Sequence, residues 1–142
     1  MSMRTYGYEG YGFAEKPIAN LERVKKFIRE KASERVRNAM EESGYQDFKT
    51  VEEFEDACDV NFNTYSISAI LSETLSDITE QDVRTLYDED DGWKILLMPR
   101  YPWKSNKQID QKEYDRIATE YAQAFYGPHS FKLDYENVSW CC

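Results

Sequence analysis

Two stretches of the chain place apolar side chains at helical spacing between helix-capping residues, and they constrain the fold more than any other feature. The first covers residues 21–43, with Asn20 as the N-cap and Gly44 as the terminating residue. The second covers residues 111–126, and Asp110 caps its N-terminus together with Glu113. Each predicted helix has one apolar face, which must be buried against a second layer of structure. The apolar positions are Leu21, Val24, Phe27, Ile28, Val36 and Met40 in the first stretch and Tyr114, Ile117, Tyr121, Ala124 and Phe125 in the second.

Shorter helices are predicted between these two stretches. Thr50 and Glu53 form a capping box in front of a helix over residues 51–58. Apolar spacing predicts another helix over about residues 65–77 and a short one over residues 79–87. The first two thirds of the chain are therefore predicted to be rich in helix.

The strand signals lie further along the chain. Residues 88–92 form a predicted turn that ends in Asp-Gly, which is typical of a hairpin when strands flank it. Residues 93–98 follow as an apolar run, and residues 131–138 alternate between apolar and charged side chains. Together with the helices, these strands predict a small single α+β domain. Its helices occupy the N-terminal two thirds, and its small antiparallel sheet is built mainly from the C-terminal third.

The N-terminal segment, residues 1–19, interleaves aromatic residues with glycines at positions 7, 10 and 12. The glycines prevent a helix, so we expect either a Tyr/Gly-rich arm or a first strand. Residues 20–142 are expected to form one α+β domain, since 142 residues suit one domain with its own core.

No segment resembles a secretory signal or a membrane span. The longest apolar run, residues 95–98, is far shorter than the roughly 20 residues that a spanning helix needs. The cysteines at positions 58, 141 and 142 form neither a disulfide framework nor a C-x-x-C motif. We therefore expect a cytoplasmic protein without a metal site or a cofactor.

The charges are distributed unevenly. Residues 44–92 carry two basic and fourteen acidic side chains, whereas residues 1–43 carry nine basic and seven acidic ones, and residues 93–142 carry seven and six. The whole net charge of -9 is therefore due to one third of the chain. A net negative charge argues against direct binding to nucleic acid or to an anionic membrane.

The acidic segment gives the leading hypothesis for function. Four carboxylates assigned to this short helix have the spacing i, i+3, i+4 and i+7, so they share one face. A surface of spaced carboxylates suits a basic, nucleic-acid-binding surface of another protein, which it would occupy and block. The expected partner-binding carboxylates are Glu52, Glu55, Asp56, Asp59, Asp88, Glu89, Asp90 and Asp91.

In size and charge the chain is similar to small acidic inhibitors from phages and mobile elements, such as anti-CRISPR and anti-restriction proteins. This similarity involves no shared motif, so it assigns no residue a role. It implies a non-catalytic nucleic-acid mimic that acts by protein–protein interaction.

Two alternatives remain open. A cluster of Arg100, Tyr101 and Trp103 beside two prolines is typical of interface anchors and predicts an interaction module with an aromatic surface. His129, the one histidine, is the candidate base of a small enzyme, although no nucleophile motif accompanies it. Because no catalytic pattern is present, we expect a protein that is not an enzyme.

Overall fold

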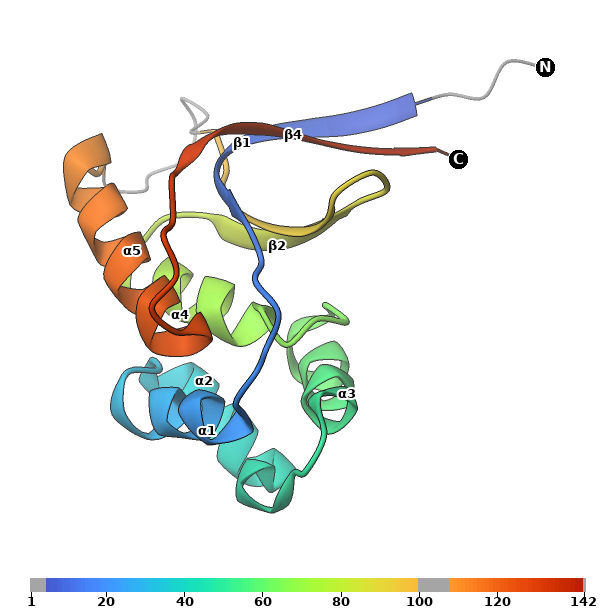
Figure 1. Ribbon diagram of the computed structural model, residues 1–142. Coiled ribbons are helices and arrows are strands. Elements are labelled where there is room, and N and C mark those ends of the chain that lie inside the picture. Colours follow the sequence, from blue (N-terminus) through green and yellow to red (C-terminus); the bar gives the residue numbers. More distant parts are fainter. Residues whose placement is uncertain (1–4, 100–107, 142) are drawn as a thin grey trace.

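Four strands form one antiparallel sheet in the order β2-β3-β1-β4, and helices lie along one side of it (Figure 1). The computed structural model describes residues 5–99 and 108–141. The α+β class is thus confirmed, although only β4 lies at the C-terminus and the other strands are spread through the chain. The elements are β1 (Thr5–Ala14), α1 (Leu21–Glu30), α2 (Glu34–Ser43), the 3-10 turn η1 (Tyr45–Asp47), α3 (Val51–Phe62), α4 (Ala69–Thr79), β2 (Val83–Asp88), β3 (Gly92–Leu97), α5 (Gln111–Tyr126) and β4 (Asp134–Cys141).

β1 is an interior strand and pairs with β3 on one side and β4 on the other. Its glycines serve close packing rather than turns. A Cβ atom at Gly12 would lie 1.9 Å from the carbonyl oxygen of Ile95 in β3. Residues 5–14 of the Tyr/Gly-rich segment therefore form a strand whose side chains Tyr11 and Phe13 are buried in the core.

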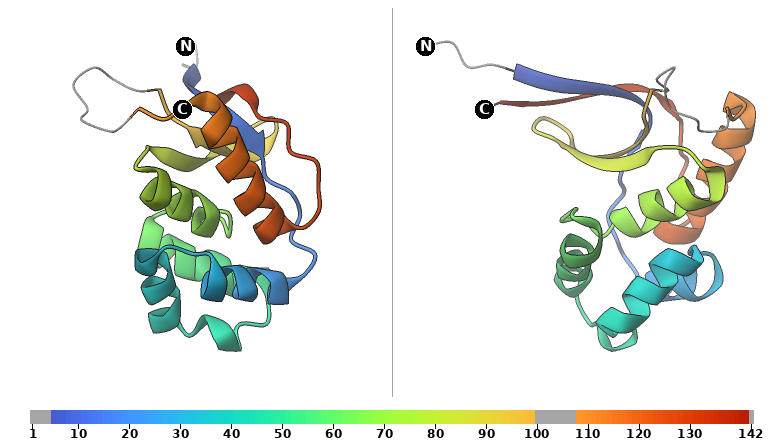
Figure 2. Two further views of the ribbon diagram at one scale, coloured as in Figure 1. Left: turned by 90° about the vertical axis from the view of Figure 1, so that its left-hand side faces the viewer. Right: turned by 180° about the vertical axis from the view of Figure 1, so that it is seen from behind.

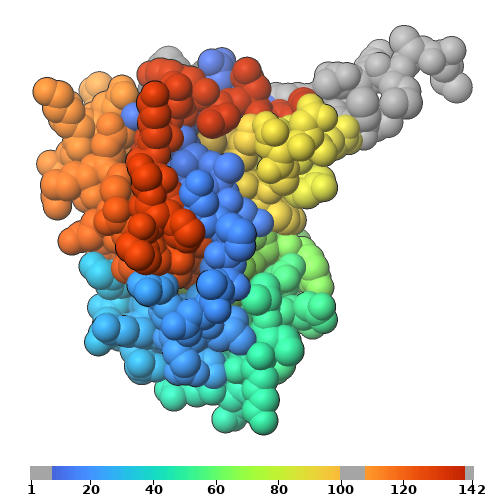
Figure 3. Space-filling view, viewed as in Figure 1, coloured from blue at the N-terminus to red at the C-terminus, as the bar shows by residue number. Residues whose placement is uncertain are grey.

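The helices form two levels beneath the sheet. α4 and α5 lie next to the sheet, and α1, α2 and α3 lie beyond them (Figures 1 and 2). The chain after β1 and the chain before β4 run side by side down this stack (Figure 3). Aromatic contacts join the sheet and the two helix levels. The rings of Phe27 in α1 and Phe125 in α5 pack edge to face with their centroids 5.2 Å apart. The ring centroids of Tyr11 in β1 and Tyr114 in α5 are 6.4 Å apart.

The predicted helix over residues 21–43 is two helices, because the chain breaks at residues 31–33. Ser33 bonds to α4 instead of continuing the helix: its hydroxyl donates to the Asp77 carboxylate at 2.7 Å, and its amide donates to Thr74 Oγ1 at 3.4 Å. Arg37 donates to the carbonyl oxygens of Ile28 and Ala32, which the end of α1 leaves without helical partners. Tertiary hydrogen bonds therefore favour the break.

The short helix predicted over residues 79–87 was wrong, since this segment forms strand β2. α4 ends at Thr79, and Glu80 reverses the chain with a left-handed φ of 57°. Val83 and Thr85 then point inwards with the two-residue period of a strand. The turn predicted over residues 88–92 is present, and because a strand rather than a helix precedes it, it joins β2 and β3 as a hairpin with Asp88 paired to Gly92.

The other predicted elements exist with shifted ends. The helix over 51–58 continues as α3 to Phe62, and the helix expected from residue 65 begins at Ala69. The last strand begins at Asp134, three residues after the start of its alternating pattern. The helix over residues 111–126 has the predicted bounds.

Candidate functional site

The exposed face of α3 carries carboxylates along its whole length. α3 begins at its capping box: the Thr50 hydroxyl oxygen accepts a hydrogen bond from the Glu53 amide at 3.3 Å. Its inner face packs Phe54, Ala57 and Cys58 into the core. The opposite face therefore turns to solvent, and Glu52, Asp56 and Asp59 are exposed while Glu55 is half-buried. All four belong to the predicted partner-binding set.

The carboxylates of this face differ from several other acidic residues, which form ion pairs within the protein. Three basic side chains neutralise part of the acidic segment. They are Arg35 with Glu73 at 2.8 Å and Asp77 at 3.0 Å, Arg84 with Asp82 at 3.0 Å, and Lys94 with Asp88 at 3.3 Å and Asp91 at 3.2 Å. Among the described residues, none of the four carboxylates on the outer face of α3 has an ion-pair partner. The negative charge of α3 is therefore left available to another molecule.

The electrostatics of this face show how close its negative charges lie. Burial raises the pKa of Glu55, and the carboxylates of Glu15, Glu52 and Asp56 raise it further. The pKa of the Tyr65 phenol is also raised, chiefly by the charge of Asp56. A positive charge brought to this face would offset the mutual repulsion of its carboxylates.

Sequence reasoning missed Glu15, which the fold brings to α3 from the end of β1. Its carboxylate accepts hydrogen bonds from Ser68 Oγ at 2.6 Å and Ser66 Oγ at 3.2 Å. The Ser68 hydroxyl also shares a 2.6 Å hydrogen bond with the buried hydroxyl of Tyr126. Glu15 lies about forty positions before α3 in the chain, and no local pattern relates the two.

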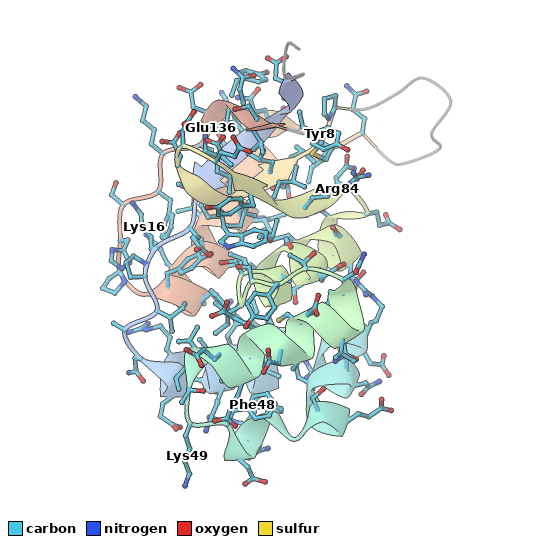
Figure 4. The ribbon with its side chains drawn as sticks, turned by 90° about the vertical axis from the view of Figure 1, so that its right-hand side faces the viewer. Tyr8, Lys16, Phe48, Lys49, Arg84 and Glu136 are labelled. Carbon is cyan, nitrogen blue, oxygen red and sulfur yellow. The ribbon has the colours of Figure 1, made fainter. Side chains whose placement is uncertain are left out.

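An apolar depression lies beside the carboxylates of α3. The shallow hollow, of about 400 Å³, is lined by Phe48, Ala57 and Val60 together with polar groups that include Asp56. Val60 is 84% exposed, which is unusual for an aliphatic side chain. Phe48 lies at the end of the molecule remote from the sheet (Figure 4). An apolar centre with a charged rim is the ordinary anatomy of a protein interface.

The hairpin carboxylates differ from those of α3. Asp88 is 3% exposed, and Ser139 donates its amide to the Asp88 carboxylate at 3.1 Å, so Asp88 is not available at the surface. Glu89, Asp90 and Asp91 are exposed at the hairpin tip, with Asp91 paired to Lys94. The hairpin and α3 lie on the same side of the molecule (Figure 1).

A small groove connects the hairpin with α3. It has a volume of about 140 Å³, and its walls include Glu15 and Ile18 after β1, Val51 and Glu55 from α3, and Trp93 from β3. The groove thus runs from α3 to the start of β3, and the hairpin carboxylates of residues 88–91 are not among the described residues that line it.

The aromatic alternative falls on residues that the structure leaves undescribed: Arg100, Tyr101 and Trp103 lie outside the described ranges.

His129 is exposed in the loop after α5. Within residues 5–99 and 108–141, no side chain forms a hydrogen bond with its imidazole. Its backbone accepts from Gln123 Nε2 at 3.3 Å, and its ring lies 6.2 Å from that of Phe131.

Other site chemistries find little support. In the described part of the chain, no three histidine, cysteine or acidic side chains are grouped so that they can hold a metal ion. Burial raises the pKa of the Cys58 thiol to about 12, so it is not a thiolate nucleophile at neutral pH. No helix in the same part combines the length and the apolar character that crossing a bilayer requires.

Comparisons with models of protein families, with curated proteins and with solved structures found no match.

Proposed function

We propose that this protein is a non-catalytic acidic protein that docks the outer face of α3 on a basic, nucleic-acid-binding surface of a partner protein and blocks it. One observation carries the proposal: Glu52, Glu55, Asp56 and Asp59 share one helix face and have no ion-pair partner among the described residues. The remaining acidic surface, at the hairpin tip, enlarges the negative field. The proposed setting is the cytoplasm, and the proposed type is that of phage or mobile-element inhibitors.

The spacing of the charges supports mimicry of a phosphate backbone. A helix rises about 1.5 Å per residue, so Glu52 and Asp59 lie about 10 Å apart along the axis of α3. The three intervals between the four charges average about 3.5 Å along the axis of α3, which is close to the length of about 3.4 Å of duplex axis per phosphate of one DNA strand. A basic groove shaped for a single backbone would therefore meet a similar linear charge density on α3.

The neighbouring apolar hollow supports the same surface. Charges steer a partner towards the protein and accelerate association, but exposed ion pairs each contribute little affinity. The hollow around Phe48, Ala57 and Val60 offers apolar area that a partner can bury after the charges have aligned it. Docking on α3 would thus add some buried apolar area to an association that the charges steer and align, and binding would still weaken at high salt.

A pull-down from lysate at two salt concentrations tests the proposal. The tagged protein captures partners at low salt, and matched samples are washed at about 0.5 M salt, where charge interactions are screened within a few ångströms. We expect a basic, nucleic-acid-binding protein that is lost in the high-salt wash. A partner that survives this wash would favour the aromatic interaction module instead. Capture of no partner at either salt concentration would contradict both docking hypotheses.

A further inference from the structure

A polar groove runs beside β2, the strand at one edge of the sheet. It has a volume of about 650 Å³, which is within the range of clefts that bind ligands. Figure 4 shows Arg84 of this strand, with α3 and α4 on the helical side of the sheet below it. The walls of the groove include Val83 and Thr85 of β2, Ser72 and Ser76 of α4, and Phe62 and Thr64 at the end of α3.

The strand register shows which backbone groups of β2 face away from the sheet. The Met98 amide donates to the Asp82 carbonyl at 2.8 Å, in line with the pairing of β2 with β3. Residues that bond to a partner strand alternate with residues that do not, so the even-numbered residues of β2 bond to β3. Val83 and Thr85 therefore turn their amide and carbonyl groups outwards, where the groove lies.

Helix α4 supplies partners for the first of these residues but not for the second. Ser76 Oγ donates to the Val83 carbonyl at 2.8 Å and accepts from the Val83 amide at 3.0 Å. Ser72, one helical turn earlier, accepts from Thr85 Oγ1 at 2.8 Å and donates to the Ala69 carbonyl at 3.4 Å, so its hydroxyl is used. Among the described residues, no group bonds to the outward amide or carbonyl of Thr85. Thr85 is only 5% exposed, and backbone groups with so little exposure nearly always have a partner.

The strand at the opposite edge of the sheet, β4, is closed by comparable contacts. The Ser139 amide donates to the Asp88 carboxylate at 3.1 Å, and the Ser139 carbonyl accepts from the Glu89 amide at 3.2 Å. Proteins commonly block their edge strands in this way, because an open edge can pair with another chain. The edge of β2 is blocked at Val83 and left open at Thr85.

The charges in the groove do not favour an ionic ligand. Arg84 pairs with Asp82 at 3.0 Å, and Glu73 pairs with Arg35 at 2.8 Å, so the charged side chains of the walls already have counter-charges. What the groove offers at Thr85 is one amide donor and one carbonyl acceptor on the same side of a strand. The backbone of a second extended chain presents the complementary pair of groups.

We propose that this groove binds an extended peptide segment of a partner protein, which pairs its backbone with Thr85 and adds a short strand to the edge of β2. The segment residue opposite Thr85 places its side chain on the same face of the sheet, beside Ser72, where α4 packs closely against β2. We therefore expect alanine, serine or threonine at that position. The groove contains none of the four carboxylates of α3, so this proposal does not rest on the proposed function.

A peptide library and two variants of one residue test the proposal. The probe is the tightest binder from an immobilised library of seven-residue peptides made of uncharged amino acids, titrated by fluorescence polarisation. Thr85→Pro removes the outward amide without breaking a bond to β3, because proline fits an edge strand where its nitrogen faces away from the ladder. Thr85→Val loses the same hydroxyl but keeps the amide. We expect Thr85→Pro to weaken binding at least about tenfold and Thr85→Val to change it less than about threefold.

Two further measurements do not depend on a variant that folds. N-methylation of the peptide at the residue that faces Thr85 should weaken binding about tenfold, whereas N-methylation of its neighbours, whose amides point away, should have little effect. Hydrogen exchange followed by NMR should show the Thr85 amide exchanging faster than the amides of Arg84 and Leu86, which bond to β3. Addition of the peptide should slow exchange at Thr85.

Each outcome decides for or against strand addition at Thr85. Melting temperatures of both variants are measured first, and if Thr85→Pro does not fold, the methylation series and the exchange rates decide. The proposal would be overturned if no peptide bound, if both variants or neither lost binding, or if methylation had the same effect at every position. It would also be overturned if the Thr85 amide of the protein alone were as protected as those of its neighbours. Protection that rose with protein concentration instead of peptide would assign the edge to a second copy of the chain and reject a peptide of a partner.

Discussion

Asp88 and Lys94 form an ion pair of 3.3 Å in which each side chain is 4% exposed. The pair anchors the β2–β3 hairpin to β4, although β1 separates β3 from β4 in the sheet. Lys94 also donates to the Asn137 carbonyl oxygen at 3.1 Å, and Asp88 accepts from the Ser139 amide at 3.1 Å. These contacts curl the sheet so that its two ends meet, and they remove Asp88 from the acidic surface.

Removing either member of this pair should destabilise the fold. Lys94→Met leaves the Asp88 carboxylate buried without a counter-charge, and we expect the melting temperature to fall by several degrees. Asp88→Asn should cost less, because Lys94 keeps the carboxylates of Asp91 and Glu136, each at 3.2 Å. Asp91→Asn is the matched control, because Asp91 contacts the same ammonium at 3.2 Å but is 64% exposed. Thermal unfolding followed by circular dichroism measures all three. Equal losses at positions 88 and 91 would contradict a structural role for the buried pair.

Acid should weaken the same anchor. The hydrogen bond from the Ser139 amide and the ammonium of Lys94 hold the pKa of Asp88 below its ordinary value. A lowered carboxyl pKa stabilises the folded state above the unfolded pKa of about 4, and this contribution is lost as the pH falls through the folded pKa. Between pH 7 and pH 2.5, the melting temperature of the wild type should therefore fall more than that of Asp88→Asn. Parallel curves for the two proteins would show that Asp88 does not carry this dependence.

Gly12 should not tolerate a side chain. A Cβ atom there would lie 1.9 Å from the carbonyl oxygen of Ile95, so Gly12→Ala must push β1 away from β3. We expect a cost of more than about 3 kcal/mol, which belongs to the severe class of single substitutions. Gly92→Ala is the comparison: Gly92 has a left-handed φ of 83° but open space around it, and its cost should be about 1 kcal/mol. Denaturant unfolding measures both, and similar losses would contradict the close approach of β1 and β3.

Two buried tyrosines should respond in opposite ways to loss of their hydroxyl. Tyr126→Phe removes the 2.6 Å hydrogen bond with Ser68, and we expect it to cost about 1 kcal/mol of unfolding free energy. Tyr114→Phe removes an unsatisfied group and should be neutral or stabilising. Denaturant unfolding distinguishes the two variants. A loss at position 114 as large as that at position 126 would mean that the Tyr114 hydroxyl already has a partner.

The fold was predictable from the sequence where a local pattern agreed with the tertiary structure. The caps and apolar stripe of residues 111–126 predicted the bounds of α5, and the acidic run ending in Asp-Gly predicted the turn at residues 88–92. The errors occurred where distant contacts decide. Ser33 ends one helix and begins another because it bonds to α4, and Val83 joins a strand because β3 pairs with it. The local spacing of apolar residues around Ser33 and Val83 does not indicate contact with α4 or pairing with β3.

The candidate site was predictable only in part, for the same reason. The spacing of Glu52, Glu55, Asp56 and Asp59 placed them correctly on one exposed helix face. The sequence did not reveal that Asp88 is buried against Lys94, because a run of acidic residues ending in glycine predicts a turn at the surface. It also did not reveal that Glu15 lies close to Glu55, since the two residues belong to segments far apart in the chain.

If the proposed function is correct, binding depends on the position at which negative charge is removed and not on the total charge removed. A variant with Glu52, Glu55, Asp56 and Asp59 all changed to lysine should lose its partner, with association slowed at least tenfold at low salt. A control variant changes four exposed acidic residues on α2 and α5, Glu34, Glu41, Glu42 and Glu120, in the same way.

Both variants shift the net charge equally, so a non-specific electrostatic attraction would weaken equally in both. Docking through α3 instead requires that the control retain most of its binding and that only the α3 variant lose it. Surface plasmon resonance against the captured partner, at about 50 mM and 500 mM salt, measures the association rates after circular dichroism has shown that both variants are folded. Equal loss in the two variants, or unchanged binding by the α3 variant, would reject docking through this face. Loss confined to the α3 variant, together with a weaker salt dependence, would locate the contact on its four unpaired carboxylates.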